Sequence, residues 1–90
     1  MSQLISTLEE KYKTRAQILL VENLSLDGIF IGEICPQGKE WLERFENVRE
    51  ISLKNTCLKN LINFPALRKL RKIQLSGNQI DLRVDFRDFL

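Results

Sequence analysis

The sequence predicts an α/β fold in which three short parallel strands line the concave face of a repeat solenoid. The main observation is an apolar pattern, L-x-x-L-x-L-x-x-N-x-L, which is filled at every position by Leu70-x-x-Ile73-x-Leu75-x-x-Asn78-x-Ile80. Two earlier segments repeat it with Thr or Ile in place of Asn: Val48-x-x-Ile51-x-Leu53-x-x-Thr56-x-Leu58 and Val21-x-x-Leu24-x-Leu26-x-x-Ile29-x-Ile31. Because parallel strands need crossovers to return the chain, each copy predicts one strand followed by a crossover.

The pattern is that of a leucine-rich repeat, whose copies recur every roughly 20–29 residues and stack into a solenoid. We expect strands at about residues 23–26, 50–53 and 72–75, in which alternate side chains point into the core. In the last copy, Asn78 should turn inward, where its amide can donate to and accept from backbone groups that would otherwise be buried without partners.

Two different crossovers are predicted. The first is a helix that begins after Gly38 and contains Trp41, Leu42 and Phe45. The second is supplied by Leu58, Leu61, Phe64, Pro65 and Leu67. Within it, Asn63-Phe64-Pro65 is expected to hold the chain extended before Leu67, because the residue before a proline avoids the helical region.

An N-terminal capping helix is predicted at residues 3–13, where Leu4, Ile5, Leu8 and Tyr12 recur at helical spacing. Solenoids need such a cap because a terminal repeat otherwise leaves its apolar interior in water. Leu8 and Tyr12 are expected to cover that interior.

The chain of 90 residues is expected to form one domain, because a chain of this length supports a single core. Its parts are an N-terminal cap (3–20), repeat 1 (21–47), repeat 2 (48–69), repeat 3 (70–80) and a partial C-terminal cap (81–90). The open C-terminal edge of the sheet would allow self-association. No apolar run approaches the ~20 residues of a membrane helix, and residues 1–10 lack signal-peptide features, so we expect an intracellular protein with no membrane contact.

Outward-facing side chains of the three strands should align in rows across the concave face, the surface that solenoids present to partners. We take these positions as the candidate partner-binding residues: Asn23, Ser25, Asp27, Glu50, Ser52, Lys54, Lys72, Gln74 and Ser76. The set is polar and lacks aromatic residues, unlike a tight hot-spot interface. The alternative is that these side chains only keep the face soluble.

No catalytic, metal-binding or cofactor-binding residue is expected, and we predict that the protein is not an enzyme. The chain has no histidine, so it lacks an imidazole base and a Ser-His-Asp triad. Cys35 and Cys57 are too few for a zinc ligand set and are expected as free thiols. The glycines form neither a P-loop nor a dinucleotide fingerprint. A solvated helix face is the favoured interpretation of Glu40, Glu43 and Glu46.

A basic cluster, Arg68, Lys69, Arg71 and Lys72, surrounds Leu70 in a chain of net charge +2. Clustered bases attract phosphate, which would favour nucleic acid. The same positions are the polar ones of the apolar repeat, and aromatic stacking residues are missing beside them. The sequence therefore argues against direct nucleic-acid binding.

Several segments carry a family resemblance: Val21 to Gly28, Ile51-Ser52, Asn55 with Leu58, Asn63-Phe64-Pro65-Ala66-Leu67-Arg68-Lys69-Leu70-Arg71-Lys72-Ile73 and Leu75-Ser76-Gly77-Asn78. They resemble the repeats of the acidic leucine-rich nuclear phosphoprotein family. The resemblance implies a short curved solenoid and a non-enzymatic regulatory role in the nucleus and cytoplasm. The protein partners it implies are histones in chromatin regulation, a phosphatase subunit that is inhibited, or an RNA-binding protein in RNA export.

We interpret the chain as a short member that lacks the later repeats and the acidic tail of this family. One alternative is an RNA–protein assembly factor similar to the A-prime leucine-rich-repeat protein of the spliceosomal U2 particle. That protein shares the F-P-x-L-R-x-L signature, found here at Phe64-Pro65-Ala66-Leu67-Arg68-Lys69-Leu70. Another alternative is an incomplete product with no independent role.

Overall fold

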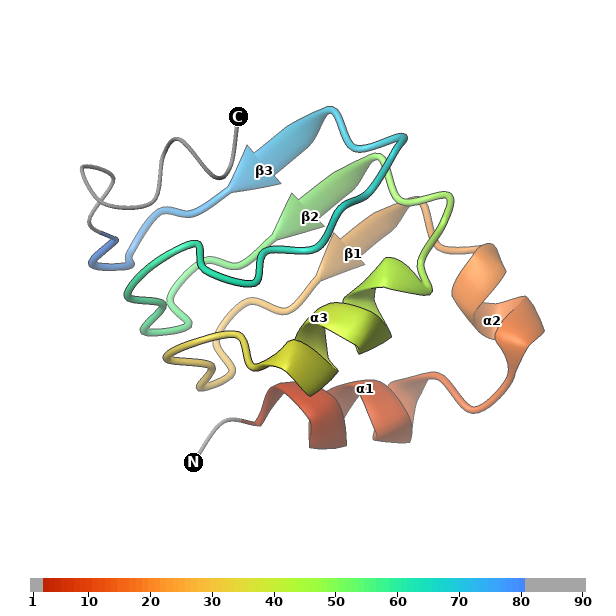
Figure 1. Cartoon of the computed structure of the whole chain (residues 1–90), viewed down its shortest axis with the longest axis horizontal. Helices are drawn as coiled ribbons and strands as arrows, with labels where there is room; N and C mark the ends of the chain where they lie inside the picture. The colour runs from red at the N-terminus through yellow and green to blue at the C-terminus, as the bar shows by residue number, and fades with distance from the viewer. Residues whose placement is uncertain (1–2, 81–90) are drawn as a thin grey trace.

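The computed structural model describes residues 3–80, which form a small α/β fold built on an open sheet of three parallel strands (Figure 1). The strands are β1 (Asn23–Ser25), β2 (Glu50–Ser52) and β3 (Lys72–Gln74), and they lie in the order β1-β2-β3. Each strand falls where the repeated apolar pattern predicts one and ends one residue earlier. The predicted three parallel strands are therefore confirmed.

The helix predicted at residues 3–13 is present as α1 (Leu4–Lys11). A second helix, α2 (Arg15–Leu19), follows it and was not predicted. A capping box separates them: the Thr14 hydroxyl accepts from the backbone N–H of Gln17 at 3.2 Å, while the Gln17 side chain accepts from the N–H of Thr14. This reciprocal pair satisfies the free amides at the start of a helix, so the chain begins a new helix there.

The first crossover contains helix α3 (Pro36–Glu43), which begins two residues before Gly38, so the prediction that it opens after Gly38 is wrong. Pro36 suits the first helical position, where its missing N–H would have no partner anyway. Cys35 caps the helix, because its Sγ accepts from the N–H of Gly38 at 3.3 Å. A side chain at position 38 would meet Leu4 of α1, so glycine allows these two helices to pack closely.

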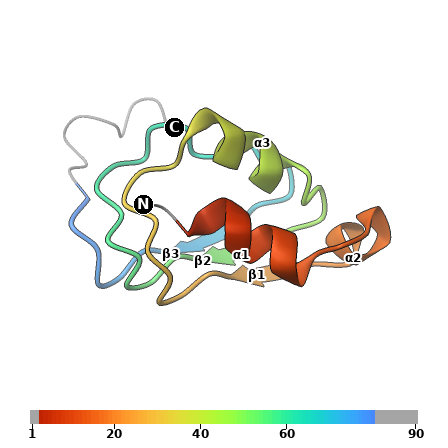
Figure 2. The same ribbon diagram turned by 90° about the horizontal axis from the view of Figure 1, so that it is seen from below.

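The helices α1 and α3 lie on one side of the sheet, and the core fills the space between (Figure 2). Figure 1 places α1 beside β1, at the opposite end of the molecule from β3. Leu8 is fully buried there, and Tyr12 packs edge-on against Phe45 with ring centroids 5.0 Å apart. The apolar core comprises Leu4, Leu8, Ile18, Leu24, Leu26, Ile31, Ile34, Leu42, Phe45, Val48, Ile51, Leu53, Leu58 and Leu61.

The second crossover, from β2 to β3, contains no helix. The expected extended conformation is wrong for Asn63, which adopts a left-handed φ of 63° in a turn. Its side-chain amide donates to the carbonyl of Ile34 at 3.0 Å. Asparagine tolerates this conformation better than other residues with side chains, and here the same side chain ties the second crossover to the first.

Asn78 turns inward, as predicted. Its Nδ2 donates to the carbonyls of Leu53 at 2.7 Å and Leu75 at 3.0 Å. Its Oδ1 accepts from the backbone N–H groups of Thr56 and Leu58, each at 3.0 Å. The amide therefore links the turn after β3 to the turn after β2.

Burial decreases toward β3. Leu24 and Ile51, the inward residues of β1 and β2, are buried, whereas Ile73 of β3 and the following Leu75 are only half-buried. Within the described residues, β3 is an edge strand. The partial cap predicted at residues 81–90 lies outside the described part of the chain.

Two further features concern the described chain as a whole. Cys35 and Cys57 are free thiols, as expected from the sequence. Among residues 3–80, no helix is both long and apolar enough to cross a lipid bilayer.

Candidate interaction face on the parallel sheet

Helices α1 and α3 lie on one side of the sheet, and no helix of the described chain covers the other side (Figure 2). The residues of the strands that do not pack against the core are polar. The observed register places Asn23, Glu50 and Lys72 in one row and Ser25, Ser52 and Gln74 in the next. Asp27, Lys54 and Ser76 follow at the same offset from their strands. The strand pairing thus brings the predicted residues together in three rows, which we call the open face.

The third row is joined to the second by a carboxylate. Asp27 Oδ1 accepts from the Ser52 hydroxyl at 2.6 Å and from the backbone N–H of Lys54 at 2.9 Å. The hydrogen bond from Ser52 is the main cause that lowers the pKa of Asp27; burial opposes it, and the amide and charge of Lys54 lower the pKa further. The ionised carboxylate of Asp27 therefore fixes Ser52 on neighbouring β2 and the backbone of Lys54 just beyond that strand.

The open face is hollowed. A depression of about 300 Å³ lies over β1 and β2 and is lined by every predicted residue except Lys72 and Ser76. Charges of both signs line it, because Asp27 and Glu50 are acidic and Lys54 is basic. Such a surface can hydrogen-bond a polar partner, but it offers no aromatic side chain to anchor a tight one.

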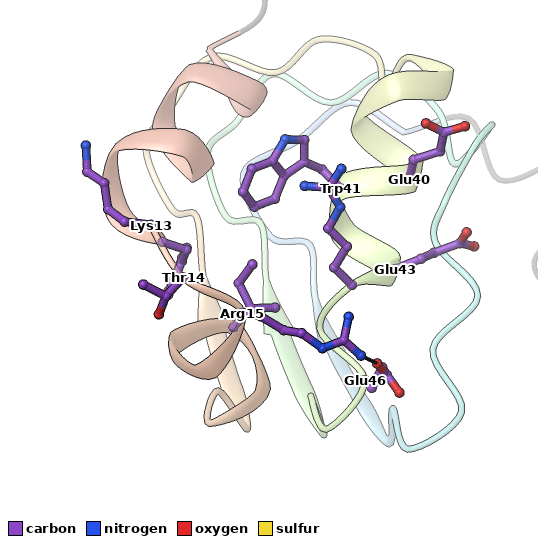
Figure 3. Close-up of a pocket in the computed structure, with 10 residues that line it drawn as sticks. Lys13, Thr14, Arg15, Glu40, Trp41, Glu43 and Glu46 are labelled. Carbon is purple, nitrogen blue, oxygen red and sulfur yellow. Dashed lines mark hydrogen bonds and ion pairs between the residues drawn. The ribbon is translucent and has the colours of Figure 1, made fainter.

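A second hollow, of about 620 Å³, lies between α3 and the segment that joins α1 to α2 (Figure 3). Trp41 points into it, and the Arg44 guanidinium lies 4.5 Å from the centre of the indole ring. Arg15 reaches across to Glu46 at 3.4 Å, with both side chains mostly exposed. Trp41, which the sequence places in the first crossover, is half-buried and packs against the core.

The three glutamates of this segment are not equivalent, so the interpretation of a simple solvated face is incomplete. Glu43 points away from the hollow (Figure 3), and its Oε2 accepts from the backbone N–H of Ala66 at 2.8 Å. Glu40 is exposed, and Glu46 pairs with Arg15. Within residues 3–80, no cluster of His, Cys, Asp or Glu side chains could hold a metal ion.

A parallel sheet with helices on one face and an open polar face on the other is compatible with a leucine-rich-repeat protein. The chain is similar to the acidic leucine-rich nuclear phosphoprotein 32-related protein of Arabidopsis thaliana, with 35% identity over 72 residues. The match covers 76% of this chain and 15% of that protein, so the chain spans about a seventh of its relative's length. No protein-family model and no solved structure matches the chain at a significant level. This similarity supports the resemblance to the acidic leucine-rich nuclear phosphoprotein family that the sequence indicated.

Proposed function

We propose that the protein is a non-enzymatic interaction module that binds another protein through the open face. The observation that supports this most directly is the alignment of polar side chains in three rows across paired strands. The helices lie on the other side of the sheet, so the described chain leaves these rows accessible (Figure 2). Open sheet faces of this kind are the usual contact surfaces of repeat proteins.

We further propose that the described chain is a leucine-rich-repeat solenoid. The three strands are successive turns of a leucine-rich-repeat solenoid, the open face is its concave side, and α1 with α2 forms its N-terminal cap. Within the described residues we propose the same parts that the sequence predicts: a cap at 3–20 and repeats at 21–47, 48–69 and 70–80. Each turn then buries its apolar residues against the next.

The name of the relative from Arabidopsis thaliana supports a nuclear protein, and we propose a nuclear and cytoplasmic location for this chain. Histones, a phosphatase subunit or an RNA-binding protein are the protein partners to test first, since the family resemblance implies them. The mixed charges of the open face favour a partner surface that is polar and of mixed sign, and not a uniformly charged one.

Variants that alter the open face without touching its internal hydrogen bonds test this proposal. Ser52 and Lys54 are poor targets because both bond to Asp27. Glu50→Arg with Gln74→Arg changes exposed or half-exposed positions and leaves the carboxylate of Asp27 in place. The matched control is Glu10→Arg with Gln37→Arg, which makes the same changes of charge on α1 and α3.

The measurement is affinity capture from nuclear extract, followed by titration of each captured protein against purified variants. A partner of the open face binds wild type and the control pair equally and loses at least about tenfold in affinity for the Glu50→Arg/Gln74→Arg variant, since two misplaced charges oppose it. A captured protein that binds all three chains equally contradicts the proposal for this face.

A further inference from the structure

Four cationic side chains gather at the end of the sheet where the strands begin. Arg49 directly precedes β2, and Arg68, Lys69 and Arg71 precede β3; Figure 1 shows both segments at the same end of the sheet. Together with Leu70 they line a shallow hollow of about 400 Å³. We call these four residues the basic rim. All four are exposed.

The backbone holds the basic rim in place. The N–H groups of Arg71 and Lys72 both donate to the carbonyl of Arg49, at 2.8 and 3.2 Å. The N–H of Leu70 donates to the carbonyl of Leu67 at 3.2 Å, which closes the turn that carries Arg68 and Lys69. The cations therefore project from a fixed scaffold, and a ligand need not pay to order the backbone beneath them.

The charges of the basic rim are poorly neutralised by the protein itself. Within the described residues, neither Arg68 nor Arg71 forms an ion pair with a carboxylate. Arg49 lies 3.7 Å from Glu22, but both side chains are about half-exposed or more, and exposed pairs of this kind are weak. Lys69 donates to the Asn47 amide oxygen at 2.8 Å, which positions its charge without cancelling it.

We propose that the basic rim is a docking site for an acidic peptide segment of a partner protein, separate from the open face. Arginine guanidinium groups pair with carboxylates in two-pronged hydrogen bonds. Leu70, half-buried at the floor of the hollow, offers an apolar contact between the charges.

The surroundings of the basic rim favour a peptide over nucleic acid. Glu22 and Glu50 border it on one side, and Glu43 and Glu46 line the next hollow beyond Arg68. A long polyanion would lay phosphates against these carboxylates, whereas a short acidic peptide fits between them. No aromatic side chain lines the hollow, so stacking of bases is not available.

Fluorescence anisotropy with a labelled Glu-Ala repeat peptide tests this proposal. Its neutral counterpart is a Gln-Ala repeat, and its nucleic-acid counterpart is an oligouridylate of the same net charge. The test variant is Arg68→Gln/Arg71→Gln. The matched control, Lys11→Gln/Lys13→Gln, removes the same charge from two exposed positions on and after α1.

We expect the acidic peptide to bind wild type and the control equally and the rim variant roughly tenfold more weakly, as the loss of two exposed charge pairs predicts. Raising the salt from about 50 to about 500 mM should abolish binding, while the neutral peptide should not bind at all. Unchanged thermal unfolding shows that the variants remain folded. Equal weakening by both variants, tighter binding of the oligouridylate, or no binding by wild type overturns the proposal.

Discussion

The side-chain oxygen of Asn78 accepts a hydrogen bond from the backbone N–H of Thr56, 22 residues earlier in the chain, at 3.0 Å. The Thr56 hydroxyl is fully buried and donates to the carbonyl of Leu53 at 2.9 Å. The strands have already ended at this point, and the N–H groups of Thr56 and Leu58 donate to the Asn78 side chain and not to a neighbouring backbone. One amide side chain replaces those missing backbone bonds and joins two turns of the fold.

Replacing Asn78 with alanine should therefore lower the free energy of unfolding by about 2–4 kcal/mol, because it leaves buried amides and carbonyls without partners. A urea titration followed by circular dichroism measures this. Asn60→Ala is the matched control, since Asn60 accepts only a local bond from Ile62 at an exposed turn. Equal losses in the two variants would contradict the role of Asn78.

Leu53 and Leu75 occupy the same position of the apolar pattern but differ in burial. Leu53 is fully buried, whereas Leu75 is half-buried beside the edge strand. Leu53→Ala should cost about 2–5 kcal/mol of unfolding free energy, and Leu75→Ala less, because a partly exposed side chain loses less transfer energy and leaves a smaller cavity. Denaturant titration of both variants under identical conditions checks the order.

Gly28 and Gly77 test the turns that follow the strands. Both have a left-handed φ, of 83° and 77°. A Cβ on Gly28 would meet nothing within 4 Å, whereas one on Gly77 would overlap the Asn55 side chain. Gly28→Ala should cost about 1 kcal/mol for the backbone conformation alone, and Gly77→Ala clearly more. Thermal melts of the two variants measure the difference. The double variant Gly77→Ala/Asn55→Gly removes the overlapping Asn55 side chain and should recover part of the lost stability.

The carboxylate of Asp27 gives a prediction about acid stability. Its pKa is lowered from the ordinary 3.8, chiefly by the hydrogen bond from Ser52. A depressed folded pKa contributes stability that is present above the unfolded pKa and is lost as the pH falls through the folded value. As the pH is lowered below 3.8, the midpoint temperature of thermal unfolding of the wild type should therefore decrease, partly because Asp27 becomes protonated.

Asp27→Asn is the variant that tests this effect, because it keeps an acceptor oxygen but cannot titrate. Its midpoint should fall less between about pH 5 and about pH 2 than that of wild type. The difference should be small, because an exposed group is well screened by water. Glu33→Gln, which removes an exposed carboxylate outside the sheet, serves as the control. Identical pH profiles for Asp27→Asn and wild type would show that the bond does not affect stability.

The strands and the inward Asn78 could be predicted because alternation of apolar residues and the position of one amide are local properties of the sequence. The start of α3 at Pro36 and the separate helix α2 could not be predicted as readily. Both depend on side-chain caps, from Cys35 and Thr14, and Cys is a weak and uncommon capping residue. Thr14 followed three residues later by Gln17 is a capping-box pattern, and this pattern could have predicted the start of α2.

The rows of the open face followed from strand register, which parallel repeats fix by their spacing. The bond from Ser52 to Asp27 was beyond prediction, since it depends on side-chain rotamers on two strands. The same is true of the basic rim. The sequence showed Arg68, Lys69 and Arg71 as neighbours, but only the backbone bonds to Arg49 show that this fourth cation joins them.

The backbone bonds between successive turns run past the ends of the strands. Leu26, Gly28 and Ile31 donate to the carbonyls of Ser52, Lys54 and Thr56, respectively. If the chain were divided into two fragments between residues 47 and 48, dissociation of the fragments would leave the N–H groups of the first and the carbonyls of the second without these partners. Insertions in the exposed turn at Ile62 leave all of these bonds intact. The chain can therefore be lengthened between its turns more safely than it can be divided there, which sets where tags and reporters can be placed.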